Sequence, residues 1–153
     1  MFAIQTTRYK KILLFGIVFW LSTALANATP LPTATSLKKE RDWLEQAAQL
    51  VLAAQGAHAD ATLFNKDVRE SRASLREIMQ QARNIELSIQ HRQLHSTMLV
   101  MDVLLKSAAA CQTGGHIVCP PMLMTQLKTV LKNSYTKYDE VMVASSDANV
   151  VSQ

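Results

Sequence analysis

The sequence predicts an all-α fold, and three features of its 153 residues point to it. Neither glycine nor proline occurs between Gly56 and Gly114, a composition that only helices make common. Apolar side chains recur every three or four residues, and no segment shows the strict alternation of a strand. With 48% hydrophobic and 18% charged residues the chain is apolar enough to fold, and its length fits one domain.

Residues 1–28 are expected to be a cleaved secretory signal peptide. Three basic residues without any acid precede the apolar run 12–21, and the small-residue motif Ala-Asn-Ala stands at 26–28. That run is shorter than the roughly 20 residues that span a bilayer as a helix. We therefore expect a periplasmic or secreted protein, in which residues 29–35 form an extended spacer; an uncut N-terminal tether is the alternative.

The charge balance changes once this segment is removed. The whole chain has 16 Lys and Arg residues against 12 Asp and Glu, for a net charge of +4. Cleavage removes three basic residues and no acid, which leaves 13 against 12. Few aromatic residues remain to stack on bases, so we expect no nucleic-acid partner. The remaining aromatic residues are Trp43, Phe64, Tyr135 and Tyr138.

The helical domain is expected to cover residues 36–143 and to begin with a helix over 36–55. Ser36 is a suitable N-cap and Gly56 a suitable stop. The apolar stripe of this helix consists of Leu37, Leu44, Ala47, Val51 and Ala54, widened by Trp43 and Leu50.

A long helix is expected next, from about Ala61 to Ala110, with Asp60 as its cap. Its first half carries a narrow, coiled-coil-like apolar seam, in which Ser71 fills one gap. The seam consists of Phe64, Val68, Leu75, Ile78, Ala82, Ile85 and Ile89. Further on the helix is apolar on all sides, which requires either a bundle core or an interface. That segment consists of Met98, Leu99, Val100, Met101, Val103, Leu104 and Leu105.

The two cysteines of the mature chain, Cys111 and Cys119, flank a turn that contains Gly114-Gly115. In an oxidising compartment such a pair predicts a disulfide that closes a helical hairpin, while a redox pair and thiolate metal ligands are the alternatives. A last helix is expected to run to about Val143, followed by a flexible tail over 144–153.

Two architectures fit these elements. An unbroken central helix would give an elongated three-helix arrangement, about 75 Å long at 1.5 Å per residue. A bend near Arg83-Asn84 or His91 would give a four-helix up-down bundle. Because no glycine or proline marks a bend, we expect the long helix.

Four residues fall on one face of the central helix, at spacings of four, three and four: His91, His95, Met98 and Asp102. Two imidazoles one turn apart can share a metal, and the thioether of Met98 would favour copper. Haem ligation by His91, His95 and Met98 is the other form of this hypothesis. The competing interpretation is a polar helix face beside core methionines, in which case no cofactor is bound.

A row of arginines occupies one side of the same helix. Arg69, Arg72, Arg76 and Arg83 fall within about 60° of one another at 100° per residue. With Met98, Leu99, Val100, Met101, Val103 and Leu104 they form the candidate surface for a protein partner or for self-association.

We therefore expect a non-enzymatic exported protein that acts through protein–protein contacts. An envelope or secretion-system assembly subunit, an adaptor, a chaperone and an inhibitor all fit this description. With a long helix packed against two shorter ones, its expected layout resembles that of minor pilus subunits of conjugation and type IV secretion systems, a likeness of layout alone. No nucleophile elbow or glycine-rich phosphate loop occurs, and no small-molecule substrate is inferred. The alternative is a periplasmic helical bundle that binds copper or haem.

Overall fold

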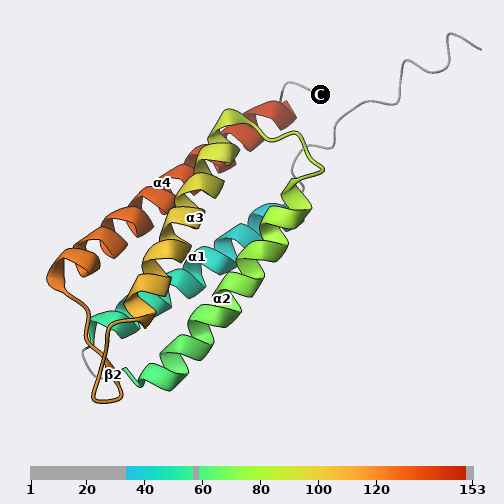
Figure 1. Ribbon diagram of the computed structural model, residues 1–153. Helices are drawn as coiled ribbons and strands as arrows, with labels where there is room; N and C mark the ends of the chain where they lie inside the picture. The colour runs from blue at the N-terminus through green and yellow to red at the C-terminus, as the bar shows by residue number, and fades with distance from the viewer. Residues whose placement is uncertain (1–33, 57–58, 151–153) are drawn as a thin grey trace, which may run out of the picture.

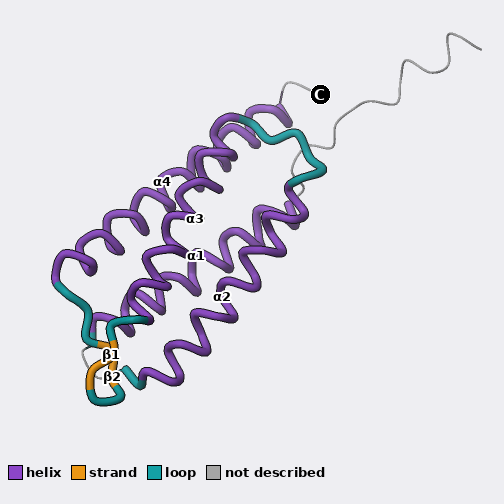
Figure 2. The backbone as a smooth tube through the Cα atoms, in the orientation of Figure 1, coloured by secondary structure: helices purple, strands orange, loops and turns teal. Residues whose placement is uncertain are grey.

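The computed structural model describes residues 34–56 and 59–150; the expected signal peptide and most of the expected spacer lie outside this part. Four helices lie side by side and run alternately up and down (Figures 1 and 2). They are α1 (Ala34–Gln55), α2 (Ala61–Ala82), α3 (Ile89–Ala109) and α4 (Pro121–Val150). A hairpin of β1 (Gln112–Thr113) and β2 (His116–Ile117) lies between α3 and α4. No described helix is both long and apolar enough to cross a membrane.

The helix expected over 61–110 is divided in two. α2 and α3 run in opposite directions on either side of residues 83–88, so the single long central helix is not present. Neither glycine nor proline marks this turn. Instead Ser88 caps α3, because its hydroxyl accepts a hydrogen bond from the backbone N–H of His91 at 3.1 Å. The turn also explains why the apolar seam stops: Ile89, its last expected member, is exposed.

The core lies along the facing sides of the helices and is mostly aliphatic. Every expected apolar position of α1 is buried, and the seam of α2 is buried as far as Ile78. Ser71 fills the gap in that seam as expected, and its carbonyl oxygen accepts a hydrogen bond from Nε1 of Trp43 at 2.9 Å. Asp60 is the N-cap of α2, as its position predicted, and accepts from the N–H of Leu63 at 2.8 Å.

The hairpin that follows α3 is hydrogen-bonded to the connection between α1 and α2. Gly114 and Gly115 have φ angles of 58° and 82°, a left-handed turn that glycine adopts at little cost. Ile117 is fully buried, and its N–H donates to the carbonyl oxygen of Ala59 at 2.9 Å. Two-residue strands are too short to leave an alternating pattern in the sequence, which is why only a turn was expected.

The disulfide expected between Cys111 and Cys119 is not formed in this structure. Both residues are free thiols, and they approach to 3.2 Å, whereas bonded sulfur atoms lie about 2.05 Å apart. Burial, together with the neighbouring Cys111, raises the pKa of Cys119 to about 12. The Cys119 thiol therefore holds its proton at neutral pH.

α4 is longer than expected. Residues 144–150, expected to belong to the flexible tail, continue the helix to Val150. No glycine or proline follows Val143 to stop it. The hydroxyl of Ser145 donates to the carbonyl oxygen of Val141 at 2.8 Å, so this polar residue is accommodated within the helix.

Candidate metal centre

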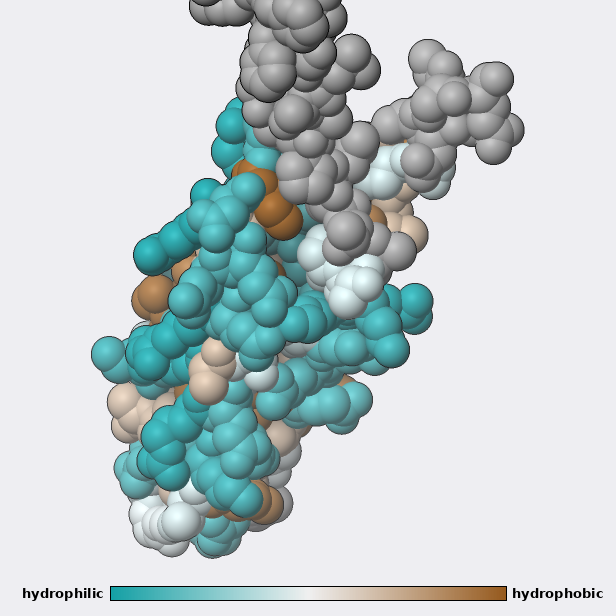
Figure 3. Space-filling model, turned by 90° about the vertical axis from the view of Figure 1, so that its right-hand side faces the viewer, coloured by the Kyte–Doolittle hydropathy of each residue, from teal (hydrophilic) through white to brown (hydrophobic). Residues whose placement is uncertain are grey.

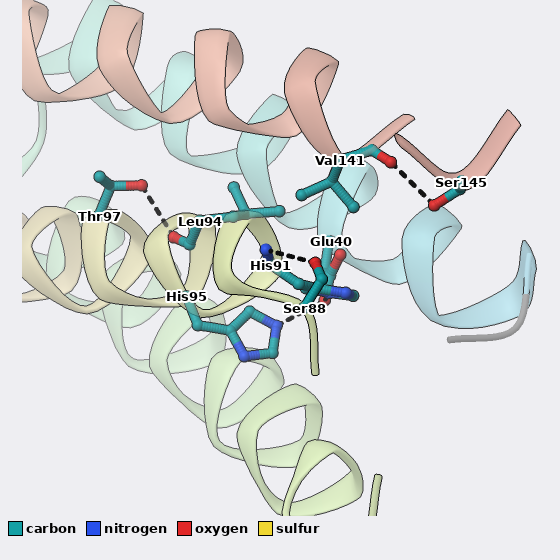
Figure 4. Close-up of polar contacts among 8 residues, drawn as sticks. All are labelled: Glu40, Ser88, His91, Leu94, His95, Thr97, Val141 and Ser145. Atoms are coloured by element: carbon teal, nitrogen blue, oxygen red, sulfur yellow. Dashed lines mark hydrogen bonds and ion pairs between the residues drawn. The ribbon is translucent and has the colours of Figure 1, made fainter. Parts of the chain in front are cut away.

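Two histidines and a glutamate meet in the interior, near the end of the bundle where α1 and α3 begin. Glu40 stands in the second turn of α1. His91 and His95 stand one turn apart at the start of α3, so that both imidazoles project from one side of the helix. All three side chains are buried, and Figure 4 shows them between the two helices.

The two imidazoles converge on a single carboxylate oxygen. Nε2 of His91 and Nε2 of His95 each lie 2.6 Å from Oε1 of Glu40. The two rings meet edge to face, with centroids 4.8 Å apart and planes inclined by 71°. One donor atom from each residue therefore lies within 4.8 Å of the other two, a separation that a single metal ion can bridge.

The electrostatics of the cluster favour an ionised carboxylate. Burial by itself raises the pKa of Glu40, but hydrogen bonds and charge from His91 and His95 outweigh it and hold that pKa below its ordinary value. Because an ionised carboxylate only accepts hydrogen bonds, both imidazoles donate to it through Nε2.

Two buried polar atoms of the cluster have no hydrogen-bond partner among the described residues. They are Oε2 of Glu40 and Nδ1 of His91. A buried polar atom without a partner costs about 1–3 kcal/mol. The hydrogen bonds within the cluster therefore leave one carboxylate oxygen and one ring nitrogen without a partner.

A small cavity adjoins the cluster. Its volume is about 20 Å³, enough for roughly one water molecule, and Glu40, His91 and His95 form part of its wall. On the outer side Lys39 of α1 donates to Glu77 at 2.8 Å and to Gln81 at 3.2 Å, which joins α1 to α2 beside the cavity. The site therefore has room for a single small ligand.

The structure brings together some of the expected ligands and separates others. His91 and His95 stand in the cluster, but its third member is Glu40, which was not a candidate. Met98 is fully buried in the core. Asp102 instead pairs with Arg72 of α2 at 3.1 Å, so the four residues expected to act together are divided among the cluster, the core and an ion pair.

The candidate partner surface is only partly exposed. Among its apolar members Met98 and Met101 are buried and Leu104 is half-buried, while Leu99, Val100 and Val103 are 49%, 48% and 61% exposed. Among its arginines Arg69, Arg76 and Arg83 are exposed, and Arg72 is half-buried in its pair with Asp102. The segment that is apolar on all sides therefore supplies both core and surface.

Comparison with known proteins adds no relative. No protein-family model, curated protein or solved structure matches this chain. The chemistry of the site is therefore the guide to function. Two imidazoles and one carboxylate are the ligand set of open zinc sites and of non-haem iron sites.

Proposed function

We propose that this protein is an exported helical bundle that binds one divalent first-row transition metal ion at Glu40, His91 and His95. The observation that supports the proposal is the meeting of these three donor groups, from two helices, in one buried cluster. To bind a metal, Nε2 of each imidazole must give up the proton that it donates to Glu40, so the ligand set is then two neutral imidazoles and one ionised carboxylate, with one negative charge. A divalent ion would offset that charge and bond to groups already desolvated.

Zinc is the ion to test first. A glutamate with two histidines leaves one position of a tetrahedral zinc site open, and the adjoining cavity has room for the water that would fill it. We propose an ion and not haem, because a cavity of about 20 Å³ is far smaller than the several hundred Å³ of an organic ligand pocket. The same small volume leads us to propose binding and not catalysis.

Zinc loading of purified protein tests this function. Cys111 and Cys119 are both replaced by serine, so that thiolates cannot bind the metal. We expect one zinc per chain by elemental analysis, and at least 100-fold weaker binding in Glu40→Gln and in His95→Ala. The matched controls are Glu45→Gln, on the exposed face of α1, and His116→Ala, in the hairpin at the other end of the bundle.

Two results would contradict the metal function. One is a protein that stays metal-free after loading with zinc, copper(II) and iron(II) in turn. The other is a set of variants that all bind zinc as tightly as the parent, which would place the metal elsewhere. Circular dichroism of each variant separates loss of a ligand from loss of the fold.

Export and disulfide formation belong to the same proposal. The basic and apolar N-terminal segment and the small-residue motif at 26–28 support cleavage before Thr29. We propose that the oxidants of that compartment join Cys111 and Cys119, which already approach to 3.2 Å. An intact mass of the exported protein checks both points: a chain that starts at Thr29 and lacks two hydrogens supports them, and an uncut or fully reduced chain contradicts them.

A second function, contact with a protein partner, is favoured by one specific observation. Leu99, Val100 and Val103 expose large apolar side chains along α3. A photo-crosslinking residue at Val103 should capture a defined envelope protein or a second copy, whereas the same residue at Thr136, on exposed α4, should not. Equal labelling from both positions would contradict this function.

A further inference from the structure

A groove of about 520 Å³ lies between α2 and α3 and shares no lining residue with the metal centre. One wall comes from α2 and its C-cap, and Leu99 and Asp102 of α3 form the other. The groove combines two features that the sequence showed separately, the arginine row and the segment that is apolar on all sides. Viewed from the α2 side, the molecule is mainly hydrophilic, with separate apolar patches (Figure 3).

Positive charge lines the groove. Arg72, Arg76 and Arg83 all border it, and they span about 16 Å along α2 at 1.5 Å per residue. Asp102 neutralises Arg72 through the 3.1 Å pair. Arg76 and Arg83 have no ion-pair partner among the described residues, so two cationic groups remain available about 10 Å apart.

The groove also offers apolar contact. Leu75 is buried, Met79 is half-buried and Leu99 is half exposed, so the three form an apolar strip beside the arginines. Val103 lies one turn beyond Leu99 on a similar side of α3 and continues the exposed strip. A ligand that fits both features is amphipathic and anionic, and as long as several helical turns.

The chain itself supplies no such ligand. Residues 1–33 contain basic residues and no acid, so they repel the arginines instead of complementing them. A second copy is also a poor match. Four of its acids are paired within the chain: Glu45 with Arg41, Glu70 with Lys66, Glu77 with Lys39 and Glu140 with Lys137. The exposed acids outside these pairs are Asp42, Asp60, Glu86, Asp139 and Asp147, and no two of them lie four or seven residues apart on one helix. The charge pattern therefore favours a different molecule.

We propose that this groove binds an acidic amphipathic helix of a partner protein. This inference deepens the partner-contact function above and is independent of the metal centre. Carboxylates at spacings of four and seven residues on the partner helix would match Arg72, Arg76 and Arg83, while its apolar stripe would cover Leu75, Met79 and Leu99. A helix fits better than a single lipid headgroup, because the charges are spread over three helical turns.

Three helical peptides with the same leucine stripe test the inference. They carry glutamate, glutamine or lysine on the flanking face, and binding to the full mature protein is followed by fluorescence anisotropy. We expect the glutamate peptide to bind at least tenfold more tightly than the glutamine peptide, and the lysine peptide not to bind. Arg76→Glu/Arg83→Glu should reverse this order, whereas Lys128→Glu/Lys132→Glu on exposed α4 should leave it unchanged.

The outcomes separate this inference from the broader partner function. Equal binding of the glutamate and glutamine peptides, lost in Leu99→Ser, would overturn the charge selection and leave partner contact standing. Binding of phosphatidylglycerol vesicles but of none of the peptides would overturn the helix as occupant. Reversal of the peptide order by the arginine variant supports the inference even where that variant loses some stability, because a merely unfolded protein would gain no affinity for the lysine peptide.

Discussion

At the residue scale, Glu40 is the member of the cluster that the sequence analysis did not identify. It lies between Leu37 and Leu44 on α1, at the three- and four-residue spacings that define the buried stripe. A charged residue at an apolar stripe position must find a partner, because burying an unpaired charge is prohibitive. The partners, His91 and His95, are 51 and 55 residues away, so local pattern alone could not identify them.

Because the hydrogen bonds of Glu40 with His91 and His95 are buried, they should stabilise the protein even without metal. Glu40→Ala removes the acceptor of two buried imidazole N–H groups and leaves a small cavity, so we expect the free energy of unfolding to fall by about 3 kcal/mol. Urea unfolding in the presence of a chelator measures it. Glu45→Ala, which breaks only an exposed pair with Arg41, should cost less than about 0.5 kcal/mol. A loss below 1 kcal/mol for Glu40→Ala would show that the cluster contributes little without metal.

At the scale of the elements, apolar periodicity predicted α1 and the buried seam of α2 as far as Ile78, because each of these helices packs along one continuous stripe. It offered a bend near Arg83-Asn84 only as the alternative to a continuous helix, and so did not decide for the turn at 83–88. Without glycine or proline, the turn depends on Ser88 as the N-cap of α3 and on the packing of α3 against the other helices. The packing is a property of the whole fold, so a local sequence pattern does not reveal it. For the same reason the histidines could be named as a pair, but not joined to α1.

The side-chain N-caps of α3 and α2 provide a matched test of how the turn at 83–88 supports the proposed metal site. Ser88 caps α3 at His91 itself, whereas Asp60 caps α2 at the hairpin end of the bundle. Ser88→Ala and Asp60→Ala should each lower the free energy of unfolding by about 1 kcal/mol. Only Ser88→Ala should also weaken zinc binding, by about tenfold in a titration, because it loosens the turn that orients His91. Equal zinc affinity in both variants would mean that the ligands are positioned by core packing alone.

At the scale of the whole molecule, two groups of residues lie at opposite ends of the bundle: the cluster of Glu40, His91 and His95, and the cysteine pair. The cluster of Glu40, His91 and His95 joins α1 to α3 where both begin, and the cysteines stand beyond the end of α3. The distance between them is about 25–30 Å along α3 at 1.5 Å per residue. The last turns of α1 and the first turns of α2 lie next to the hairpin, not next to the metal centre. Metal binding at one end and a disulfide at the other would therefore stabilise different sets of contacts.

This separation predicts that the two constraints add. Zinc at 100 times its dissociation constant should raise the free energy of unfolding by about 2.7 kcal/mol. The Cys111–Cys119 disulfide should raise it by about 2–3 kcal/mol on the chain-entropy argument. Urea unfolding of four states measures both: oxidised protein and the Cys111→Ser/Cys119→Ser variant, each with and without zinc. The combined gain should equal the sum to within about 0.5 kcal/mol, because sites so far apart share no contacts. A deviation above 1 kcal/mol would instead mean that α3 transmits strain along its length, and that the redox state of the cysteines regulates the metal centre.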